Sequence, residues 1–292
     1  MSLEPRVSAV VVVRDIDQSS AQAPLDLCIR SALAEPLIDD LVVVDAGNSE
    51  TVAAGLRALQ ADRRDVKLVV AEPGANAAAD ANLGARHALG RWILFLDAGV
   101  VLQRNAVSRM AAASGGAPTP WIVGGRLTDA DGREQRVARG GALTTWSAIG
   151  EALSWPAPKP RHRAAKKAEK GEPPPATKVA AVSGALMLMP RSDFQTLGGF
   201  DEDFNGAYAD LDLCRRAAEA GGRVLFQPEA GGVQLARGER ARHRAENLAH
   251  FAAKSAKTPF QRAFAAIAKP ALTVLVVLKD FVIGRPPRPR RR

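Results

Sequence analysis

Hydrophobic residues along the first hundred positions follow two alternating patterns. Short unbroken runs rich in Val, Ile and Leu, such as VSAVVVV at 7–13, are typical of buried strands in a parallel sheet. Between these runs, apolar residues recur every three or four positions, which predicts amphipathic helices. Strands are expected at 7–13, 41–44, 67–71 and 92–96, and helices at 24–34, 51–61 and 77–89.

Strands that alternate with helices at this spacing indicate βαβ units and an α/β domain with a mostly parallel sheet. The second half is more mixed, with strands predicted at 121–127, 179–189 and 223–226, and helices at 192–197, 211–220 and 240–257. The strand at 179–189 is expected to be interrupted at residues 183–185. In such sheets, ligands bind beyond the carboxyl ends of the strands. The first candidates for a site are therefore the polar residues that follow the predicted strands: Arg14, Asp15, Asp45, Asn48, Asn76 and Asp97.

The chain carries a net charge of +9 over 292 residues, which favours an anionic partner such as a nucleotide diphosphate or an acidic lipid. Basic residues cluster at 159–170 and 285–292. The first cluster lies in segment 156–178, which is rich in Pro, Lys and Glu and has no apolar period, so we predict a mobile loop there. Nucleic-acid binding is not expected, because no recognition motif accompanies the basic residues.

The C-terminal segment 251–292 is predicted to be a helical extension with a basic tail. Its apolar stretch, 271–283, is shorter than the roughly 18 residues that a membrane span needs. This stretch can lie on an anionic membrane surface or pack on the core, and both interpretations stay open. Cys28 and Cys214 fall in apolar helical patterns and no signal peptide is visible, so a cytoplasmic location is expected, either free or at the inner face of the membrane.

Six segments resemble the family 2 glycosyltransferases, in the order in which that family places them. They are VSAVVVV at 7–13, LVVVDAGNSE at 41–50, EPGANAAADANLGARHALG at 72–90, WILFLDAGVVL at 92–102, VSGALMLMPRSDFQTLGGFDEDF at 182–204 and ADLDLCRRAAEAG at 209–221. The similarity is greatest to the rhamnosyltransferase-like members that build bacterial polysaccharides. It implies a GT-A fold, a Rossmann-like sheet flanked by helices, over residues 1–250, and inverting transfer of a sugar from a nucleotide-sugar.

On the donor side, the resemblance assigns contact with the nucleobase to Asp45, while Asn76 and Asn82 would orient the base or ribose. Asp45 and Asn76 also suit a turn or a helix N-cap, and this simpler interpretation stays open. Asp97 matches the first carboxylate of the family's Asp-x-Asp motif, which holds Mg²⁺ or Mn²⁺ against the diphosphate.

Three positions depart from the family's pattern. Gly99 replaces the second carboxylate of the Asp-x-Asp motif, Gln234 stands near the place of a His, and Ala209 replaces a Glu. The first two changes put the metal in doubt, and the third lies beside the candidate base. Without a metal, basic side chains are the natural partners of a diphosphate. The candidates are Arg237, Arg240 and Arg242, or else the basic segment 161–167 acting as a lid.

On the acceptor side, Asp210 matches the family's general base. It would take the proton from an acceptor hydroxyl as that oxygen attacks the anomeric carbon, although a helix cap would also explain an Asp here. Asp212 is expected to be a structural carboxylate near the N-terminus of a helix. Contacts with the sugar or acceptor are predicted for Gly184, Ala185, Gly199 and Asp201, where ordinary turn residues are the alternative.

Two functions follow from these residues. The first is an active glycosyltransferase that acts on a hydroxyl of a glycan or a lipid-linked acceptor. The second is a non-catalytic relative that binds nucleotides or serves as a scaffold at the membrane. The retained Asp45, Asp97 and Asp210 favour the first function, and the three departures favour the second.

Overall fold

The computed structural model describes residues 6–14, 22–135, 139–140, 176–204, 208–235, 247, 250–251 and 253–254. The chain divides into two compact units, residues 1–142 with 162–240 and residues 143–161 with 241–292. The helices and strands given below belong to the first unit. Most of the predicted basic loop and the whole segment 271–292 lie outside the described residues, so the membrane prediction is not tested.

The N-terminal half is built from alternating strands and helices, as the hydrophobic pattern predicts. Its four parallel strands run in the order β3-β2-β1-β4. Most of their apolar side chains are buried, because helices cover the sheet on both faces. The elements are β1 (Val7–Val13), α1 (Gln22–Leu33), β2 (Ile38–Asp45), α2 (Glu50–Asp62), β3 (Val66–Val70), α3 (Ala77–His87) and β4 (Trp92–Asp97).

The second half adds a mixed part to the same sheet. Among the described residues the sheet has nine strands, in the order β3-β2-β1-β4-β10-β6-β11-β5, with β8 also paired to β11. Strand β10 is antiparallel to both of its neighbours, β4 and β6. The added elements are β5 (Val100–Leu102), α4 (Ala106–Ala113), β6 (Trp121–Thr128), β8 (Thr177–Lys178), β10 (Leu186–Pro190), α6 (Arg191–Thr196), α7 (Ala209–Glu219) and β11 (Arg223–Gln234).

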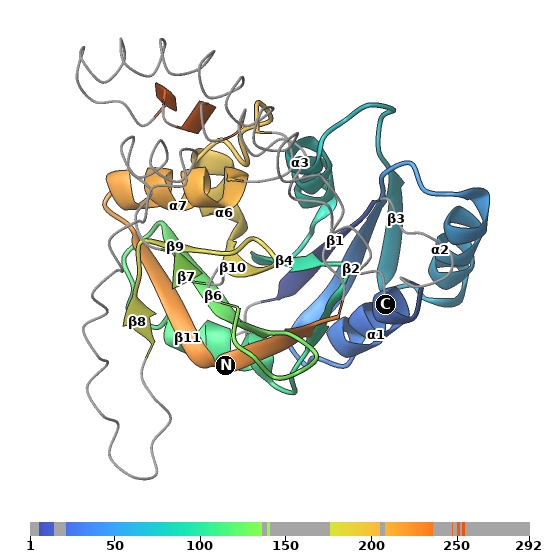
Figure 1. Cartoon of the computed structure of the whole chain (residues 1–292), viewed down its shortest axis with the longest axis horizontal. Coiled ribbons are helices and arrows are strands. Elements are labelled where there is room, and N and C mark those ends of the chain that lie inside the picture. Colours follow the sequence, from blue (N-terminus) through green and yellow to red (C-terminus); the bar gives the residue numbers. More distant parts are fainter. Residues whose placement is uncertain are drawn as a thin grey trace, which may run out of the picture. The chain divides into compact units, whose positions relative to one another are not determined.

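A small second sheet lies over the main one. It pairs β7 (Arg139–Gly140) with β9 (Ala181–Val182) in antiparallel fashion. A Cβ atom at Gly124 of β6 would lie 2.4 Å from Cβ of Val182, so β9 sits directly on this part of the main sheet. Helices α3, α6 and α7 lie on the same face as β9, while α1 and α2 lie on the opposite face (Figure 1).

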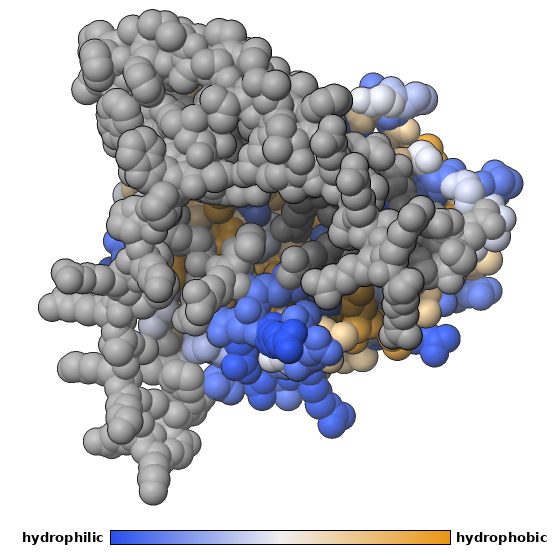
Figure 2. All heavy atoms as spheres, viewed as in Figure 1, coloured by the Kyte–Doolittle hydropathy of each residue, from blue (hydrophilic) through white to orange (hydrophobic). Residues whose placement is uncertain are grey.

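The face that carries α3, α6 and α7 is packed tightly against the central strands. A Cβ at Gly84 of α3 would lie 2.4 Å from Cγ1 of Val10 in β1, so a glycine is needed for the close approach. Phe95 of β4 packs against Phe194 of α6 and against Phe200, with ring centroids 5.0 Å and 4.8 Å apart. On the surface seen in Figure 2, the protruding described residues are mainly hydrophilic and the hydrophobic ones show mainly in recesses.

Two predicted boundaries are wrong, both because of pairing between distant segments. The loop expected at 156–178 ends in a strand, since Thr177–Lys178 pairs with Leu225 and Phe226 of β11. The interruption expected within the strand at 179–189 is confirmed, since β9 and β10 are joined by a turn over residues 183–185. The strand expected at 223–226 continues to Gln234, because β11 pairs with β6 and β5 across a register shift. No helix within the described ranges is long and apolar enough to cross a membrane.

A buried ion pair joins the end of β1 to α3. The side chain of Asp80, in the first turn of α3, is fully buried and forms a salt bridge with Arg14. Arg14 also donates a hydrogen bond to the carbonyl of Ala75 at 2.7 Å. Burial raises the pKa of the Asp80 carboxyl, and the hydrogen bond from Arg14 opposes that rise. The pair therefore keeps α3 beside the carboxyl end of β1.

Replacing Arg14 with Gln should leave Asp80 as a buried charge without a cation. We expect Arg14→Gln to lower the free energy of unfolding by about 3 kcal/mol at pH 7. A raised pKa in the folded state means that protonation favours folding, so the loss should shrink as the pH falls and Asp80 takes up a proton. Urea unfolding at pH 7 and pH 5 measures both effects.

The matched control is Arg57→Gln, which breaks an exposed pair with Glu50. The free energy of unfolding of that variant should fall by about 1 kcal/mol or less, because the broken ion pair is exposed to solvent. Equal losses in the two variants, or a loss in Arg14→Gln that does not change with pH, would contradict the role given to the pair.

Candidate functional site

Asp97 and Asp210 are both attached to the turn between β9 and β10, Asp97 through its backbone and Asp210 through its carboxylate. Asp97, the last residue of β4, donates its backbone N–H to the carbonyl of Ala185 at 3.0 Å. One residue earlier in the turn, the N–H of Gly184 donates to Oδ2 of Asp210 at 2.8 Å. A Cβ at Gly184 would lie 3.2 Å from Cβ of Asp210, so the two segments are in close contact. The turn, residues Ser183–Ala185, therefore brings two distant aspartates to one short segment.

The environment of Asp97 matters for the expected metal. Its Oδ1 accepts a hydrogen bond from the N–H of Gly99 at 2.9 Å. The carbonyl of Gly99 accepts one from Leu235 at 2.8 Å, and Gln234 pairs with Val100, so the end of β11 lies beside this turn. The structure thus brings Asp97, Gly99 and Gln234 together. They supply one carboxylate, a residue without a side chain and an amide, which do not match the carboxylate-rich set that Mg²⁺ and Mn²⁺ favour.

Asp45 lies at the same edge of the sheet, with β1 between it and Asp97. It is nearly buried, and its Oδ1 accepts hydrogen bonds from the backbone N–H and the side-chain amide of Asn48, at 3.2 Å and 2.7 Å. The same amide also donates to the carbonyl of Val13 at 2.7 Å. Within the described part of the chain, these bonds occupy only Oδ1. Oδ2 is therefore the atom of Asp45 that can receive a ligand donor.

Asn76 and Asn82 make hydrogen bonds within the protein. Oδ1 of Asn76 caps α3 by accepting from the N–H groups of Ala78 and Ala79, both at 3.0 Å, and its amide donates to the carbonyl of Glu202. The Asn82 amide donates to the carbonyl of Phe200 at 2.8 Å, and its Oδ1 accepts from the N–H of Phe200 at 2.9 Å. The cap formed by Asn76 agrees with the simpler interpretation left open from the sequence. Both side chains also hold residues 199–202 against α3, and contact of either one with the donor stays a prediction.

The glycine and acidic residues after α6 also have packing roles. Gly199 has a positive φ of 73°, and a Cβ there would lie 2.7 Å from Oδ1 of Asn82, so another residue would not fit. Asp201 accepts a hydrogen bond from the N–H of Asp203 at 3.0 Å. Ala185 is buried and presents its carbonyl to Asp97. Contacts of these residues with a sugar or acceptor stay predictions.

Several predicted residues lie outside the part of the chain that the structure describes. They are Asp15, the basic segment 161–167 and the three expected phosphate partners, Arg237, Arg240 and Arg242.

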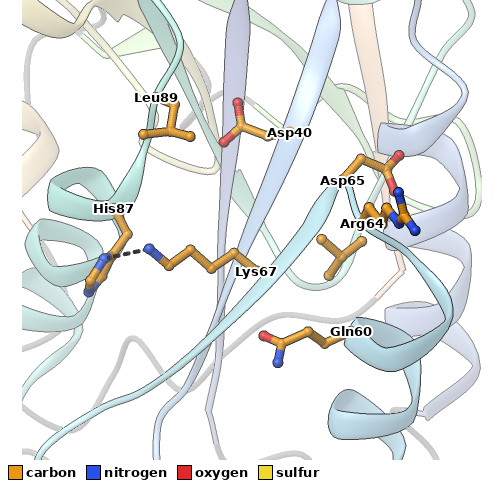
Figure 3. Close-up of a pocket in the computed structure, with 8 residues that line it drawn as sticks. Asp40, Gln60, Arg64, Asp65, Lys67, His87 and Leu89 are labelled. Atoms are coloured by element: carbon orange, nitrogen blue, oxygen red, sulfur yellow. Dashed lines mark hydrogen bonds between the residues drawn. The ribbon is translucent and has the colours of Figure 1, made fainter.

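A hollow of about 280 Å³ lies at the amino ends of β2 and β3, away from Asp97 (Figure 3). Several of its polar groups already have protein partners: Nζ of Lys67 lies 3.0 Å from Nδ1 of His87, and Asp40 accepts from Ser8 at 2.6 Å. Burial, Lys67 and Arg86 together lower the pKa of His87, which favours the neutral ring, the form whose Nδ1 can accept a hydrogen bond from Lys67. We therefore do not place the candidate site in this hollow.

Comparison with known proteins identifies the family. A model of the family described as "Glycosyltransferase like family 2" matches residues 5–269. The chain belongs to glycosyltransferase family 2. No curated protein matches the sequence.

Solved structures show the same GT-A fold at low sequence identity. This family 2 chain is similar to GalNAc-T7 with UDP, GalNAc and Mn²⁺, at 17% identity and a TM-score of 0.63, over 82% of this chain and 45% of that one. It is also similar to the mannosyltransferase PcManGT from Pyrobaculum calidifontis in complex with GDP-Man and Mn²⁺ (19% identity, TM-score 0.57, 99% and 78% covered). A third similar structure is S. aureus TarS 1-349 in complex with UDP-GlcNAc (12% identity, TM-score 0.58, 89% of this chain and 69% of that chain covered).

The family 2 chain therefore spans less than half of the GalNAc-T7 chain, and these identities establish the fold alone. The α/β sheet flanked by helices, expected from the resemblance, is confirmed. The family assignment is confirmed as well. The site residues are not tested by these comparisons.

Asp212 anchors the segment that precedes α7. Its side chain is fully buried and forms ion pairs with Arg215 at 2.8 Å and Arg216 at 2.7 Å. Arg216 in turn donates to the carbonyls of Leu197 and Gly199. This agrees with the structural role expected for Asp212. Arg216 was not singled out from sequence, although its position four residues after Asp212 is the spacing at which helical side chains meet.

Replacing Asp212 with Ala should leave two buried or half-buried arginines without their shared carboxylate. We expect Asp212→Ala to lower the free energy of unfolding by about 3 kcal/mol, measured by urea denaturation. Asp62→Ala, at the end of α2 and exposed, is the control and should change stability by less than about 0.5 kcal/mol. A loss in Asp212→Ala as small as in the control would exclude the anchoring role.

Proposed function

We propose that this protein transfers a sugar from a nucleotide-sugar to a hydroxyl of a glycan or a lipid-linked acceptor, with inversion at the anomeric carbon, in bacterial polysaccharide synthesis. Membership of glycosyltransferase family 2 supports sugar transfer. The observation that carries the proposal is the joint attachment of Asp97 and Asp210 to the Ser183–Ala185 turn. A donor carboxylate and a candidate base are thereby held at one place on the carboxyl edge of the sheet.

Asp210 is the proposed general base. Each of its carboxylate oxygens accepts one backbone N–H, from Gly184 at 2.8 Å and from Leu211 at 2.9 Å. These bonds orient the carboxylate and leave a lone pair on each oxygen for an acceptor hydroxyl. The hydroxyl proton moves to Asp210 as the hydroxyl oxygen bonds to the anomeric carbon. The bond from that carbon to the diphosphate breaks, and a single displacement of this kind inverts the configuration.

Asp45 is proposed to contact the nucleobase through Oδ2, and Asp97 marks the position of the diphosphate. The structural relatives contain UDP, GDP-mannose or UDP-GlcNAc, so a nucleoside diphosphate is the shared part of their ligands. Two of them contain Mn²⁺. Because Gly99 and Gln234 do not complete a metal site around Asp97, we propose donor binding that does not need a metal.

The same departures favour a second candidate function. With Gly99, Gln234 and Ala209 in place of three polar or charged family residues, the protein can retain nucleotide binding without turnover. Such a protein would act as a nucleotide-binding or scaffolding partner. Binding and turnover must therefore be measured separately.

Calorimetric titration with UDP, dTDP and GDP, each with and without Mn²⁺, tests the donor site. We expect one nucleotide to bind and its affinity to change less than threefold on adding Mn²⁺, because the residues around Asp97 do not complete a metal site. A gain of tenfold or more with Mn²⁺ would contradict metal-independent binding. Absence of binding to all three would contradict the proposed function.

Replacing Asp210 with Asn tests the base. Asp210→Asn should keep the fold and the donor affinity but lower turnover of the matching nucleotide-sugar by about 10²- to 10⁴-fold, because the amide cannot take up the hydroxyl proton. Glu219→Gln, at the exposed end of the same helix, is the control and should keep full turnover. Turnover in Asp210→Asn within threefold of the unmodified protein would exclude Asp210 as the base, and absence of turnover in the unmodified protein would favour the non-catalytic relative.

A further inference from the structure

Arg126 of β6 lies at the same level as Asp97 along the direction that crosses the strands. Strand β10 runs between them, and the N–H of Asp97 donates to the carbonyl of Ala185 just before that strand. On the other side, Met187 is paired with Gly124 and Leu188 with Val123. Continuing this register places Ala185 opposite Arg126. Two strand spacings then separate the Cα atoms of Asp97 and Arg126 by about 10 Å.

Arg126 and Asp97 also face the same side of the sheet. Side chains two positions apart in a strand point to the same face. Gly124 faces Val182 of β9, so Arg126 lies on the face that carries the Ser183–Ala185 turn. Phe95 faces α6, so Asp97 lies on this face as well. Figure 1 shows α6, α7 and β9 above this side of β4, β10 and β6.

Arg126 has no anionic partner within the described part of the chain. Three other partly buried arginines on this face, Arg14, Arg215 and Arg216, each contact a carboxylate at the distance of an ion pair. Nε of Arg126 is buried without a hydrogen-bond acceptor, as are the Nε atoms of Arg14 and Arg215. Arg14 and Arg215 each have a carboxylate as ion-pair partner, whereas the guanidinium of Arg126 pairs with no carboxylate of the described residues. A half-buried cation without a partner is unfavourable in the unliganded protein. An anion that binds next to Asp97 and the turn would remove this cost.

We infer that Arg126 binds the diphosphate of the donor and supplies the positive charge that a metal would otherwise bring to this position. The inference rests on the proposed function and deepens it by naming the group that neutralises the diphosphate. A guanidinium group presents paired N–H donors that match two phosphate oxygens. Its charge would stabilise the leaving diphosphate as the bond to the anomeric carbon breaks. Arg126 thus joins Asp97 and Asp210 around the Ser183–Ala185 turn.

The experiment compares a nucleoside diphosphate with the monophosphate of the same base, by calorimetry without metal and with EDTA. Arg126→Gln should weaken diphosphate binding about 10- to 100-fold, because a charged hydrogen-bonding partner is lost. Monophosphate binding should change less than threefold, and Arg126→Lys should retain part of the diphosphate affinity. Arg133→Gln is the matched control, since Arg133 lies beyond the same strand and its side chain is exposed.

The outcomes separate the two proposals. If the unmodified protein binds the diphosphate and Arg126→Gln binds it equally well, the role of Arg126 is overturned while the proposed function stands. An equal loss of monophosphate and diphosphate binding also overturns it, because it indicates a general disturbance of the site. If the unmodified protein binds no nucleotide, the proposed function fails and this inference fails with it.

A stability measurement gives a second readout. In the absence of nucleotide, Arg126→Met should unfold at the same urea concentration as the unmodified protein or at a higher one, because it removes a cation that is buried without a partner. A saturating diphosphate should stabilise the unmodified protein more than the variant, since ligand binding to the folded state adds to its stability. A clear loss of stability in ligand-free Arg126→Met would mean that Arg126 has a structural role, and would overturn the inference.

Discussion

The hydrogen bonds of the Ser183–Ala185 turn are the constraint on which the candidate site depends. One bond joins the turn to Asp97 at the end of β4, and another joins it to Asp210 at the start of α7. The turn occupies this position because β10 inserts between β4 and β6 in antiparallel fashion. The parallel half of the sheet provides Asp97, and the mixed half provides Asp210. Without β10, these residues would belong to unconnected parts of the fold.

A second set of contacts keeps the start of α7 in place. Residues 199–202 are held from one side by Asn82 of α3 and from the other by Arg216 of α7. Arg216 is itself fixed by the buried carboxylate of Asp212. The ion pair between Arg14 and Asp80 then fixes α3 to the end of β1. These links run from the carboxyl edge of the parallel strands to the proposed base, so the base is positioned by rigid elements rather than by a loop.

The parallel half of the fold could be predicted from sequence because its signals are local. Each strand is a continuous apolar run and each helix has its own periodicity. Asp45, Asp97 and Asp210 could be named because they follow strands or begin a helix within motifs that resemble a family. The cap at Asn76 is one of two interpretations open from the sequence. The contacts of Asn82 could not be predicted, since its partner, Phe200, lies 118 residues later. The length of β11 depends on a register shift, and the position of Arg126 depends on the order of β4, β10 and β6, which no local pattern encodes.

The departures from the family's metal motif and the position of Arg126 fit one electrostatic arrangement. A second carboxylate beside Asp97 is useful only when a divalent cation separates it from the diphosphate; without the cation it would repel the phosphate oxygens. Gly99 and Gln234 are both uncharged, so they leave Asp97 as the one carboxylate of that turn. A guanidinium group two strands away then adds a positive charge that persists at any physiological pH. On this account Gly99, Gln234 and Arg126 form a single adaptation, in which a fixed side-chain cation replaces a bound metal ion.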